Sequence, residues 1–296
     1  MNNMRLIGKY VNGNYKVAIF NDGTKIRHTD DNYWNAQFPE NIDLKITNNC
    51  DMRCPYCHEN STIDGKHGDI MNMEFINTLM PYTEVAIGGG NALEHPYLVP
   101  FLQKLKERNI FANITVNQYH FMENLMLIQL LVERELIKGL GVSLMNTTED
   151  FISEISKFEN AVIHIINGVE LVSNFKKLYD KDLKVLILGY KEFRRGKDYY
   201  SEKVEVRKNM LKEELPNLIN HFQVVSFDNL ALEQLDVTTL LGDKWNNFYM
   251  GDDGQFTMYI DAVTGTFGKS STMPIADRLP ITNNINDMFK IVKEMK

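Results

Sequence analysis

Short β-rich runs alternate with amphipathic helical segments along most of the chain after residue 41. The helical segments carry apolar residues at spacings of three and four, as in Leu98, Phe101, Leu102 and Leu105. The expected strands span residues 44–47, 84–87, 112–116, 141–144, 162–166 and 184–188, with 223–227 as a candidate seventh. Because strands that alternate with such helices form βα units, the pattern predicts an α/β fold with a parallel sheet, arranged as a partial (β/α)6-type barrel.

The segments that flank this region have different patterns. Residues 1–40 predict a small β-meander, because Asn12-Gly13 is a strong two-residue turn between two alternating runs. Residues 229–296 predict a helix, a β-hairpin over 256–269 and a last short helix. We therefore expect three parts: a meander packed on the barrel (1–40), the barrel itself (41–228) and an extension that covers the substrate (229–296).

Charge and hydropathy exclude several classes of protein. The net charge of −7 argues against non-specific binding of nucleic acid, so nucleic acid is not an expected partner. The most apolar run, residues 125–131, is much shorter than the ~20 residues that a transmembrane helix needs. The first ten residues lack the basic-then-apolar pattern of a secretory signal. We expect a cytoplasmic protein with no membrane partner.

The only three cysteines of the chain lie within eight residues of one another, at Cys50, Cys54 and Cys57. An odd, clustered set of cysteines is not a disulfide framework, and cytoplasmic thiols stay reduced. The spacing C-x3-C-x2-C, directly after the first predicted barrel strand, lets three thiolates converge on one metal centre. We therefore expect a metal site on this loop.

The number of cysteines restricts the kind of metal centre. Iron–sulfur clusters normally take four cysteines, so a cluster held by these three has one iron without a protein ligand. An open coordination position is typical of a catalytic site. Two other interpretations stay open: a zinc site completed by His58 or His67, and a redox pair of Cys54 and Cys57, although no thioredoxin pattern surrounds that pair.

The cysteine motif resembles the signature of one enzyme superfamily. An aromatic residue, Tyr56, precedes the last cysteine, and a predicted strand precedes the first. In this setting C-x3-C-x2-C resembles the motif of the radical S-adenosylmethionine (SAM) enzymes, and the resemblance covers residues 42–228. It implies that Cys50, Cys54 and Cys57 hold one [4Fe–4S] cluster, that the amine and carboxylate of SAM bind the fourth iron, and that Tyr56 lies against the adenine.

The end of the second predicted strand carries a glycine triplet, Gly88-Gly89-Gly90, followed by Asn91. Taken alone, a glycine triplet is more often a turn than a site, because glycine permits unusual backbone angles. Here it resembles the Gly-Gly-Glu segment that contacts the SAM amine in this superfamily. The sequence departs from that pattern at Asn91, whose amide oxygen accepts a hydrogen bond without the charge of a carboxylate.

Further candidates stand at later strand ends. By resemblance, Asn117 and Ser143 reach the SAM ribose and carboxylate, and Gly189 lets the backbone approach the adenine. An equally simple interpretation is that the two polar residues only close their strands. Arg194 and Arg195 are expected to hold an anionic group or to form a solvated basic turn.

The C-terminal region bears on the number of clusters. Residues 250–269 have the outline of the hairpin that carries auxiliary clusters in many peptide-modifying radical SAM proteins, but they contain no cysteine. The resemblance therefore implies a member without auxiliary clusters. The hairpin and the N-terminal meander are the expected covers of the barrel mouth.

The resemblance implies a definite chemistry. An external one-electron donor such as flavodoxin or ferredoxin reduces the cluster, SAM is cleaved to a 5′-deoxyadenosyl radical, and this radical abstracts hydrogen from a substrate. The hairpin extension favours a peptide or protein side chain as the substrate. Two alternatives stay open: the same chemistry on a nucleotide or small metabolite, and a non-catalytic iron–sulfur or zinc-binding module.

Overall fold

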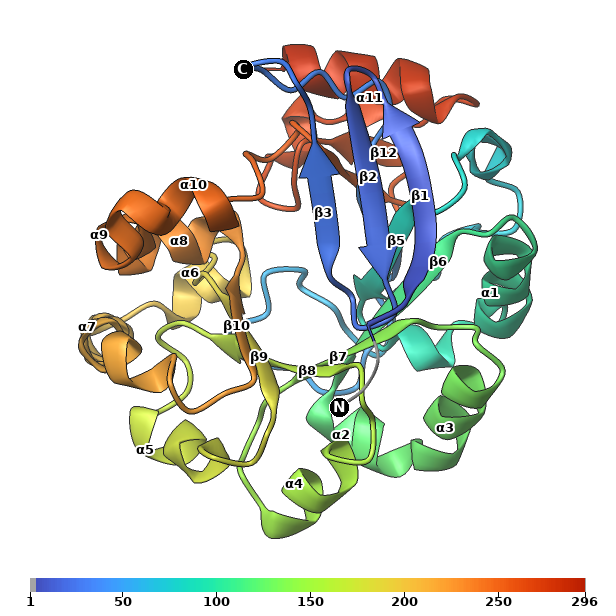
Figure 1. The fold of residues 1–296 in the computed structure, drawn as a ribbon. Helices are drawn as coiled ribbons and strands as arrows, with labels where there is room; N and C mark the ends of the chain where they lie inside the picture. The colour runs from blue at the N-terminus through green and yellow to red at the C-terminus, as the bar shows by residue number, and fades with distance from the viewer. Residues whose placement is uncertain (1–3, 296) are drawn as a thin grey trace.

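In a computed structural model that describes residues 4–295, ten strands form one curved, open sheet with helices on its outer face (Figure 1). The order across the sheet is β10-β9-β8-β7-β6-β5-β4-β11-β12-β13. Neighbours from β4 to β10 pair in parallel. These seven strands are β4 (Asn41–Thr47), β5 (Glu84–Gly89), β6 (Phe111–Asn117), β7 (Gly139–Ser143), β8 (Ala161–Ile166), β9 (Lys184–Leu188) and β10 (Val224–Phe227).

The two faces of the sheet differ in polarity. In β6, Ala112, Ile114 and Val116 are buried, whereas the alternate residues Asn113 and Thr115 are only half-buried. Because successive side chains of a strand point to opposite faces, the apolar set packs under the helices and the polar set lines the lumen of the partial barrel. The lumen is therefore a polar space that is able to hold a ligand.

Helices on the outer face of the sheet cover its apolar side. In α1 the residues Leu98, Phe101, Leu102 and Leu105 are all buried, as their spacing predicts. The helix α7 contains Pro216 in its last turns. The helices of this part of the chain are α1 (Leu98–Glu107), α2 (Gln118–Glu123), α3 (Leu125–Glu133), α4 (Glu149–Ile155), α5 (Val172–Phe175), α6 (Arg195–Tyr199) and α7 (Glu202–Leu218).

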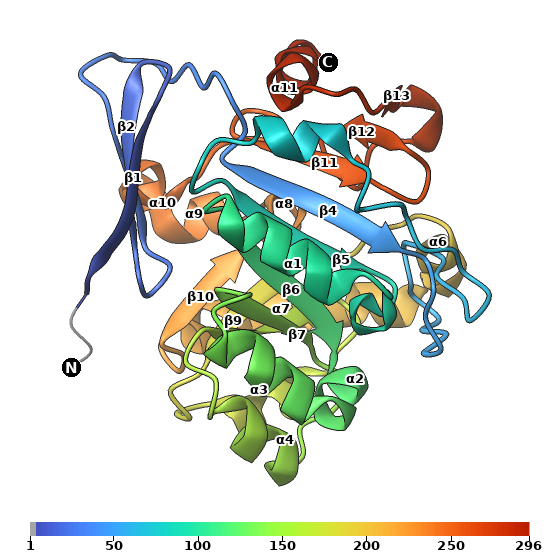
Figure 2. The same cartoon turned by 90° about the vertical axis from the view of Figure 1, so that its right-hand side faces the viewer.

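The N-terminal residues form a three-stranded antiparallel meander of β1 (Leu6–Asn12), β2 (Tyr15–Phe20) and β3 (Lys25–His28). Lys25 Nζ lies 2.8 Å from a carboxylate oxygen of Glu84 and 2.9 Å from Asn41 Oδ1, and these two residues begin β5 and β4. Figure 2 shows the meander at this end, with the loop that follows β4 at the opposite end. The expectation that the meander closes the barrel mouth is therefore wrong.

The C-terminal residues extend the same sheet. β11 (Thr257–Asp261) pairs in parallel with β4, and β12 (Thr266–Gly268) and β13 (Leu279–Pro280) follow antiparallel. The predicted hairpin therefore forms, but it lies beside β4 as part of the sheet. If the sheet ended at β4, as in the expected six-stranded barrel, one edge of β4 would have no hydrogen-bonded neighbour; β11 occupies that edge.

Short helices complete the C-terminal part of the chain. α8, α9 and α10 follow β10 directly, and α11 lies beyond β13. Among residues 4–295 no helix combines the length and apolar character needed to cross a bilayer. These helices are α8 (Asn229–Leu235), α9 (Val237–Leu241), α10 (Trp245–Phe248) and α11 (Ile285–Glu294).

Candidate functional site

The cysteine loop begins where β4 ends, on the carboxyl side of the sheet. Its backbone is held by a short bridge between Asn49 and Thr62, and Cys50 N donates to Thr62 O at 2.9 Å. Cys50, Cys54 and Cys57 are free and half-buried. Burial raises the pKa of the Cys50 and Cys54 thiols; Cys54 also feels the charge of Cys57 and Cys50, and Cys50 that of Cys57, so the three thiols share one region.

The three thiols do not lie in the compact arrangement that a single metal ion imposes on its ligands. A tetrahedral Zn²⁺ with Zn–S bonds of ~2.3 Å holds its thiolates about 3.8 Å apart. Within residues 4–295, the one group of three metal-type side chains whose ligand atoms lie within 4.8 Å of one another is Cys50, Asp51 and His120. The three cysteines do not form such a group, as expected for thiolates at separate corners of a larger centre.

The two histidines considered for a zinc site make other contacts. His58 Nε2 lies 3.4 Å from Glu59 Oε1, and His67 Nδ1 lies 2.9 Å from Thr47 Oγ1. Neither joins the cysteines in a compact group of metal ligands within the described chain. The zinc interpretation therefore has no fourth ligand at either position.

Buried polar atoms without partners surround the loop. Asn48 Oδ1, Ser61 Oγ and Arg195 Nε are buried and make no hydrogen bond. Native proteins normally satisfy such groups, so three of them around one loop indicate space for a polar ligand. The donor set of three free thiols and these unpaired atoms fits an iron–sulfur cluster with a polar cosubstrate.

The glycine triplet lets β5 approach the cysteine loop. Gly89 has a φ of 117°, and a Cβ there would lie 2.4 Å from Thr47 O. A Cβ on Gly90 would lie 2.1 Å from Asn49 O. By contrast, a Cβ on Gly88 would meet nothing within 4 Å. Gly89 and Gly90 are thus required by the protein's own packing, and Gly88 faces open space.

Asn91 has a structural contact of its own. It is buried, and its Oδ1 accepts from Leu93 N at 3.3 Å, which caps the short 3₁₀ turn Ala92–Glu94. Its backbone N–H donates to Asn49 O at 2.7 Å. Asn91 therefore lies against the cysteine loop, but one lone pair of its amide oxygen is already used.

Asn117 and Ser143 are neighbours in the sheet. They pair in register across β6 and β7, and Ser143 pairs with His164 of β8. Asn117 Oδ1 also accepts from Tyr119 N at 2.9 Å, which caps α2. Burial lowers the pKa of His164 to about 4, so this histidine is neutral in the lumen. Asn117, Ser143 and His164, a histidine with no role assigned from the sequence, thus form a row of polar residues across three neighbouring strands.

Tyr56 and Gly189 meet at a small cavity. Both line a space of about 40 Å³ together with Leu188. The Tyr56 ring packs edge-on against Tyr199, with the ring centres 5.7 Å apart. A Cβ on Gly189 would lie 2.4 Å from Leu230 Cγ, so the close packing of α8 already requires a glycine there.

Besides His164, two functional candidates were missed by sequence reasoning. His120, from α2, donates its Nε2–H to Asp51 Oδ1 in the cysteine loop at 2.7 Å. Glu170 follows β8, and its carboxylate accepts from Ile166 N at 2.9 Å. Burial raises the pKa of Glu170 to about 8. Both lie far along the chain from the cysteines, so no local pattern indicated them.

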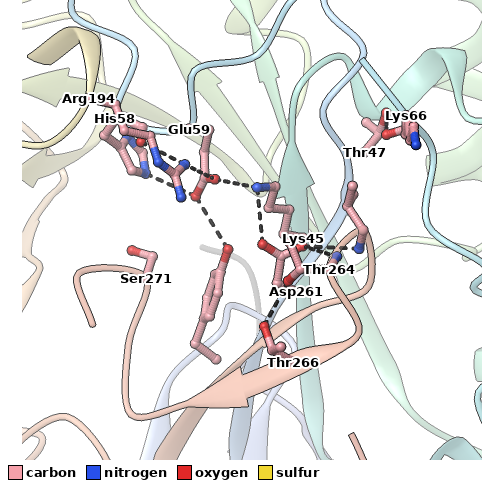
Figure 3. A network of polar contacts seen from close by, with 12 residues as sticks. Lys45, Thr47, His58, Glu59, Lys66, Arg194, Asp261, Thr264, Thr266 and Ser271 are labelled. Atoms are coloured by element: carbon pink, nitrogen blue, oxygen red, sulfur yellow. Dashed lines mark hydrogen bonds and ion pairs between the residues drawn. The ribbon is translucent and has the colours of Figure 1, made fainter. Parts of the chain in front are cut away.

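A buried network of charges joins the cysteine loop to the C-terminal strands (Figure 3). Lys45 Nζ lies 2.6 Å from Glu59 Oε2 and 3.2 Å from Asp261 Oδ2. Arg194 Nη1 lies 3.2 Å from Glu59 Oε2 and also donates to His58 O at 3.0 Å. Burial alone would raise the pKa of Glu59, but its contacts with His58 and Lys45 hold that pKa below its usual range.

A large cavity lies beside this network. It measures about 870 Å³ and opens between the β9–β10 side of the sheet and the C-terminal segment. Tyr190 and Lys191 line both this cavity and the small cavity next to Tyr56, so the two cavities are neighbours. The ionisable side chains of the large cavity are mostly acids: Asp43, Glu192, Asp228, Glu233, Asp252 and Asp253, against Lys191 and Lys269.

Comparisons with known proteins gave structural matches alone. No protein-family model matches the sequence, and no curated protein matches it. The crystal structure of Streptococcus suis SuiB bound to S-adenosylmethionine matches over 97% of this chain and 90% of its own, with a TM-score of 0.61 and 12% identity. SuiB without a named ligand matches with a TM-score of 0.54, also at 12% identity, over 90% of this chain and 81% of its own.

A third match is SuiB bound to the precursor peptide SuiA. It covers 78% of this chain with a TM-score of 0.53 and 16% identity. The matched part spans 59% of that SuiB chain, which is less than two thirds of its length. At these identities the likeness shows the fold: this chain is a mixed α/β protein whose large parallel sheet is arranged as in SuiB.

Proposed function

We propose that this chain is a radical SAM enzyme that acts on a peptide or protein side chain. The observation that carries the proposal is the cysteine loop itself. It presents three free, half-buried thiols at the carboxyl end of the first parallel strand, spread more widely than a single ion requires. The SAM-bound SuiB structure, which has the same fold, supports SAM as the cosubstrate.

Cys50, Cys54 and Cys57 would hold one [4Fe–4S] cluster. With that cluster reduced by an external donor such as flavodoxin or ferredoxin, the bound cofactors would supply a 5′-deoxyadenosyl radical for hydrogen abstraction. The chain contributes binding, orientation and exclusion of water. Its half-buried thiols and the unpaired polar atoms around them suit a desolvated site that opens towards the lumen.

Residues around the loop would orient SAM. Gly88 borders open space at the end of β5, so its backbone is accessible to the methionine part of SAM. Asn117 and Ser143, side by side at the carboxyl edge, would reach the ribose and carboxylate. Tyr56 and Gly189 line one small cavity, which supports the proposed contact with the adenine. Asn91 would contribute the remaining lone pair of its amide oxygen.

The large cavity favours a peptide over a nucleotide. A volume of about 870 Å³ accommodates a peptide segment, and it borders the space next to Tyr56. Its excess of carboxylates would repel phosphate groups. The precursor peptide bound to SuiB is a further argument for this substrate class. The C-terminal residues Tyr249, Asp252 and Asp253 and the segment 269–272 line the cavity and would cover the substrate there.

Anaerobic reconstitution with iron and sulfide tests the proposal. We expect about four iron and four sulfide per chain, and an electron paramagnetic resonance (EPR) signal of the reduced cluster that changes on addition of SAM. Cys54→Ala should lose the metal and the signal while it keeps the circular dichroism of the fold. One zinc per chain with no SAM-dependent signal would overturn the proposal and favour a non-catalytic metal-binding module.

A further inference from the structure

Arg195 lies against the cysteine loop although it follows β9, which is separated from β4 by four strands of the sheet. It begins α6, shortly after β9, and its Nη2 donates to Ser61 O at 2.9 Å. Ser61 precedes Thr62, whose carbonyl accepts from Cys50 N. A Cβ on the next residue, Gly196, would lie 3.4 Å from Tyr56 O. The guanidinium is therefore held beside the cysteine loop by its bond to Ser61 O, and the backbone of the next residue, Gly196, runs close to Tyr56.

The guanidinium of Arg195 is incompletely satisfied. The Arg195 Nε is buried and has no hydrogen-bond partner, whereas the Nη2 of the same guanidinium donates to the Ser61 carbonyl. Its neighbour Arg194 is different, because it pairs with the carboxylate of Glu59. A buried donor without an acceptor is costly, although the Arg195 side chain as a whole is only partly buried. Because the group is cationic, an anion is the acceptor that suits it best, and no carboxylate among residues 4–295 bonds this Nε.

The charge of Arg195 acts on the thiols. It opposes the effect of burial on the pKa of both Cys50 and Cys54. A guanidinium that influences two of the three thiols lies close to the space that they enclose. This electrostatic contact agrees with the position given by the Ser61 hydrogen bond.

We propose that Arg195 donates its free Nε–H to an anionic acceptor of the bound cofactors. The acceptor is either a sulfur of the cluster or the methionine carboxylate of SAM, and both are anions at this edge of the site. Arg195 is in this sense a positioning residue for the cofactors. The inference rests on the proposed function and assigns to Arg195 a role separate from that of the cysteine ligands.

Reconstituted Arg195→Gln distinguishes the two acceptors. If the acceptor is a cluster sulfur, loss of the donor should shift the reduction equilibrium of the SAM-free cluster about tenfold towards the oxidised form, or about 59 mV for one electron. If the acceptor is the SAM carboxylate, that potential should stay unchanged and the Kd for SAM, measured by EPR titration, should rise about tenfold. A wild-type potential together with a wild-type Kd would overturn the inference.

Arg108→Gln is the matched control. Arg108 also has a buried Nε without a partner and also donates to a backbone carbonyl, that of Asn77, but it lies at the end of α1. It should change neither the potential nor the Kd. If it shifts them as much as Arg195→Gln does, the effect belongs to any buried arginine and the inference fails.

Arg195→Lys keeps the test decisive if the glutamine variant does not fold. A lysine ammonium lacks the planar fork that bonds Ser61 O and a second acceptor together, so one of the two constants should still move by about threefold or more. Wild-type values for both constants in this variant would contradict the inference. Failure of the wild-type chain to bind a cluster or SAM would instead refute the proposed function.

Discussion

Lys45 Nζ lies 2.6 Å from Glu59 Oε2, and both side chains are buried. Lys45 belongs to β4, the strand that precedes the cysteine loop, and Glu59 follows the last cysteine by two residues. The pair therefore joins the two ends of the segment that carries all three thiols. Asp261 of β11 provides a second anion for Lys45, which links the loop to the C-terminal strands as well.

Glu59→Gln should destabilise the chain strongly. The variant takes one of two anions from Lys45 and the carboxylate partner from Arg194, and breaking a buried ion pair costs up to about 3–5 kcal/mol. Urea unfolding of the metal-free protein measures this change. Glu154→Gln is the control, because the Lys157–Glu154 pair is exposed and is expected to contribute about 0–1 kcal/mol. Equal losses in the two variants would mean that the buried network does not stabilise the loop.

Gly88→Ala and Gly90→Ala should differ sharply. A methyl at Gly90 meets the Asn49 carbonyl at 2.1 Å, so this variant should lose about 1–3 kcal/mol of stability. A methyl at Gly88 enters open space, so the free energy of unfolding should stay near that of the wild type. We expect Gly88→Ala instead to raise the Kd for SAM. An unchanged Kd would remove Gly88 from the binding site.

Substitutions of Asn91 separate its two roles. Asn91→Ala loses the cap on Leu93 N and should lower stability by about 1 kcal/mol, with weaker binding of SAM. Asn91→Asp keeps the cap and adds a negative charge that, in the proposed site, would face the SAM amine, so it should bind SAM more tightly, while the buried carboxylate lowers stability when SAM is absent. Thermal unfolding and SAM titration measure both effects. Unaltered SAM affinity in both variants would show that Asn91 is only a cap.

Glu170 should make the stability of the chain fall as the pH rises. Burial raises its pKa from 4.5 to about 8, so the folded state favours the protonated acid. Its contribution is fully present below pH 4.5 and is lost as the pH rises towards 8. Glu170→Gln, which is neutral at every pH, should therefore be more stable than the wild type at pH 9, by on the order of 2 kcal/mol.

Unfolding in urea at pH 5 and pH 9 measures the effect of Glu170. The difference between variant and wild type should be small at pH 5 and large at pH 9. Glu205→Gln provides the control, because hydrogen bonds from Tyr200 and Lys208 lower the pKa of Glu205, so its contribution to stability changes only below about pH 4.5 and its effect should be the same at pH 5 and pH 9. A constant difference across this pH range would show that Glu170 does not titrate as expected.

Local patterns predicted the parts of the fold that depend on neighbouring residues. The apolar face of α1, the N-terminal hairpin and the parallel strands all follow from periodicity and turn chemistry. The hairpin turns at Gly13-Asn14, one residue later than the predicted Asn12-Gly13, because Asn12 pairs with Tyr15 as the last residue of β1. The position of β11 beside β4 could not be predicted in this way, because the pairing joins residues that are far apart in the chain, such as Thr257 and Asn41. A strand sequence specifies which face is apolar, and not which distant edge it will pair with.

The candidate site was predictable to a similar extent. The cysteine spacing indicated the metal loop, whereas the packing role of Gly189 depends on Leu230 of a later helix. The Lys45–Asp261 contact spans 216 positions, so no motif encodes it. For Arg195 the sequence left an anion contact and a solvated basic turn both open, because its unpaired Nε is a property of the folded chain.

The most direct test of the central proposal is reductive cleavage of SAM. The reconstituted wild-type chain, supplied with dithionite or reduced flavodoxin under anaerobic conditions, should release 5′-deoxyadenosine and methionine, measured by liquid chromatography with mass spectrometry. Cys54→Ala, treated identically, should release neither. Formation of 5′-deoxyadenosine by the wild type alone would establish radical SAM chemistry, and its absence from a wild-type sample with a complete, reducible cluster would contradict the proposed function.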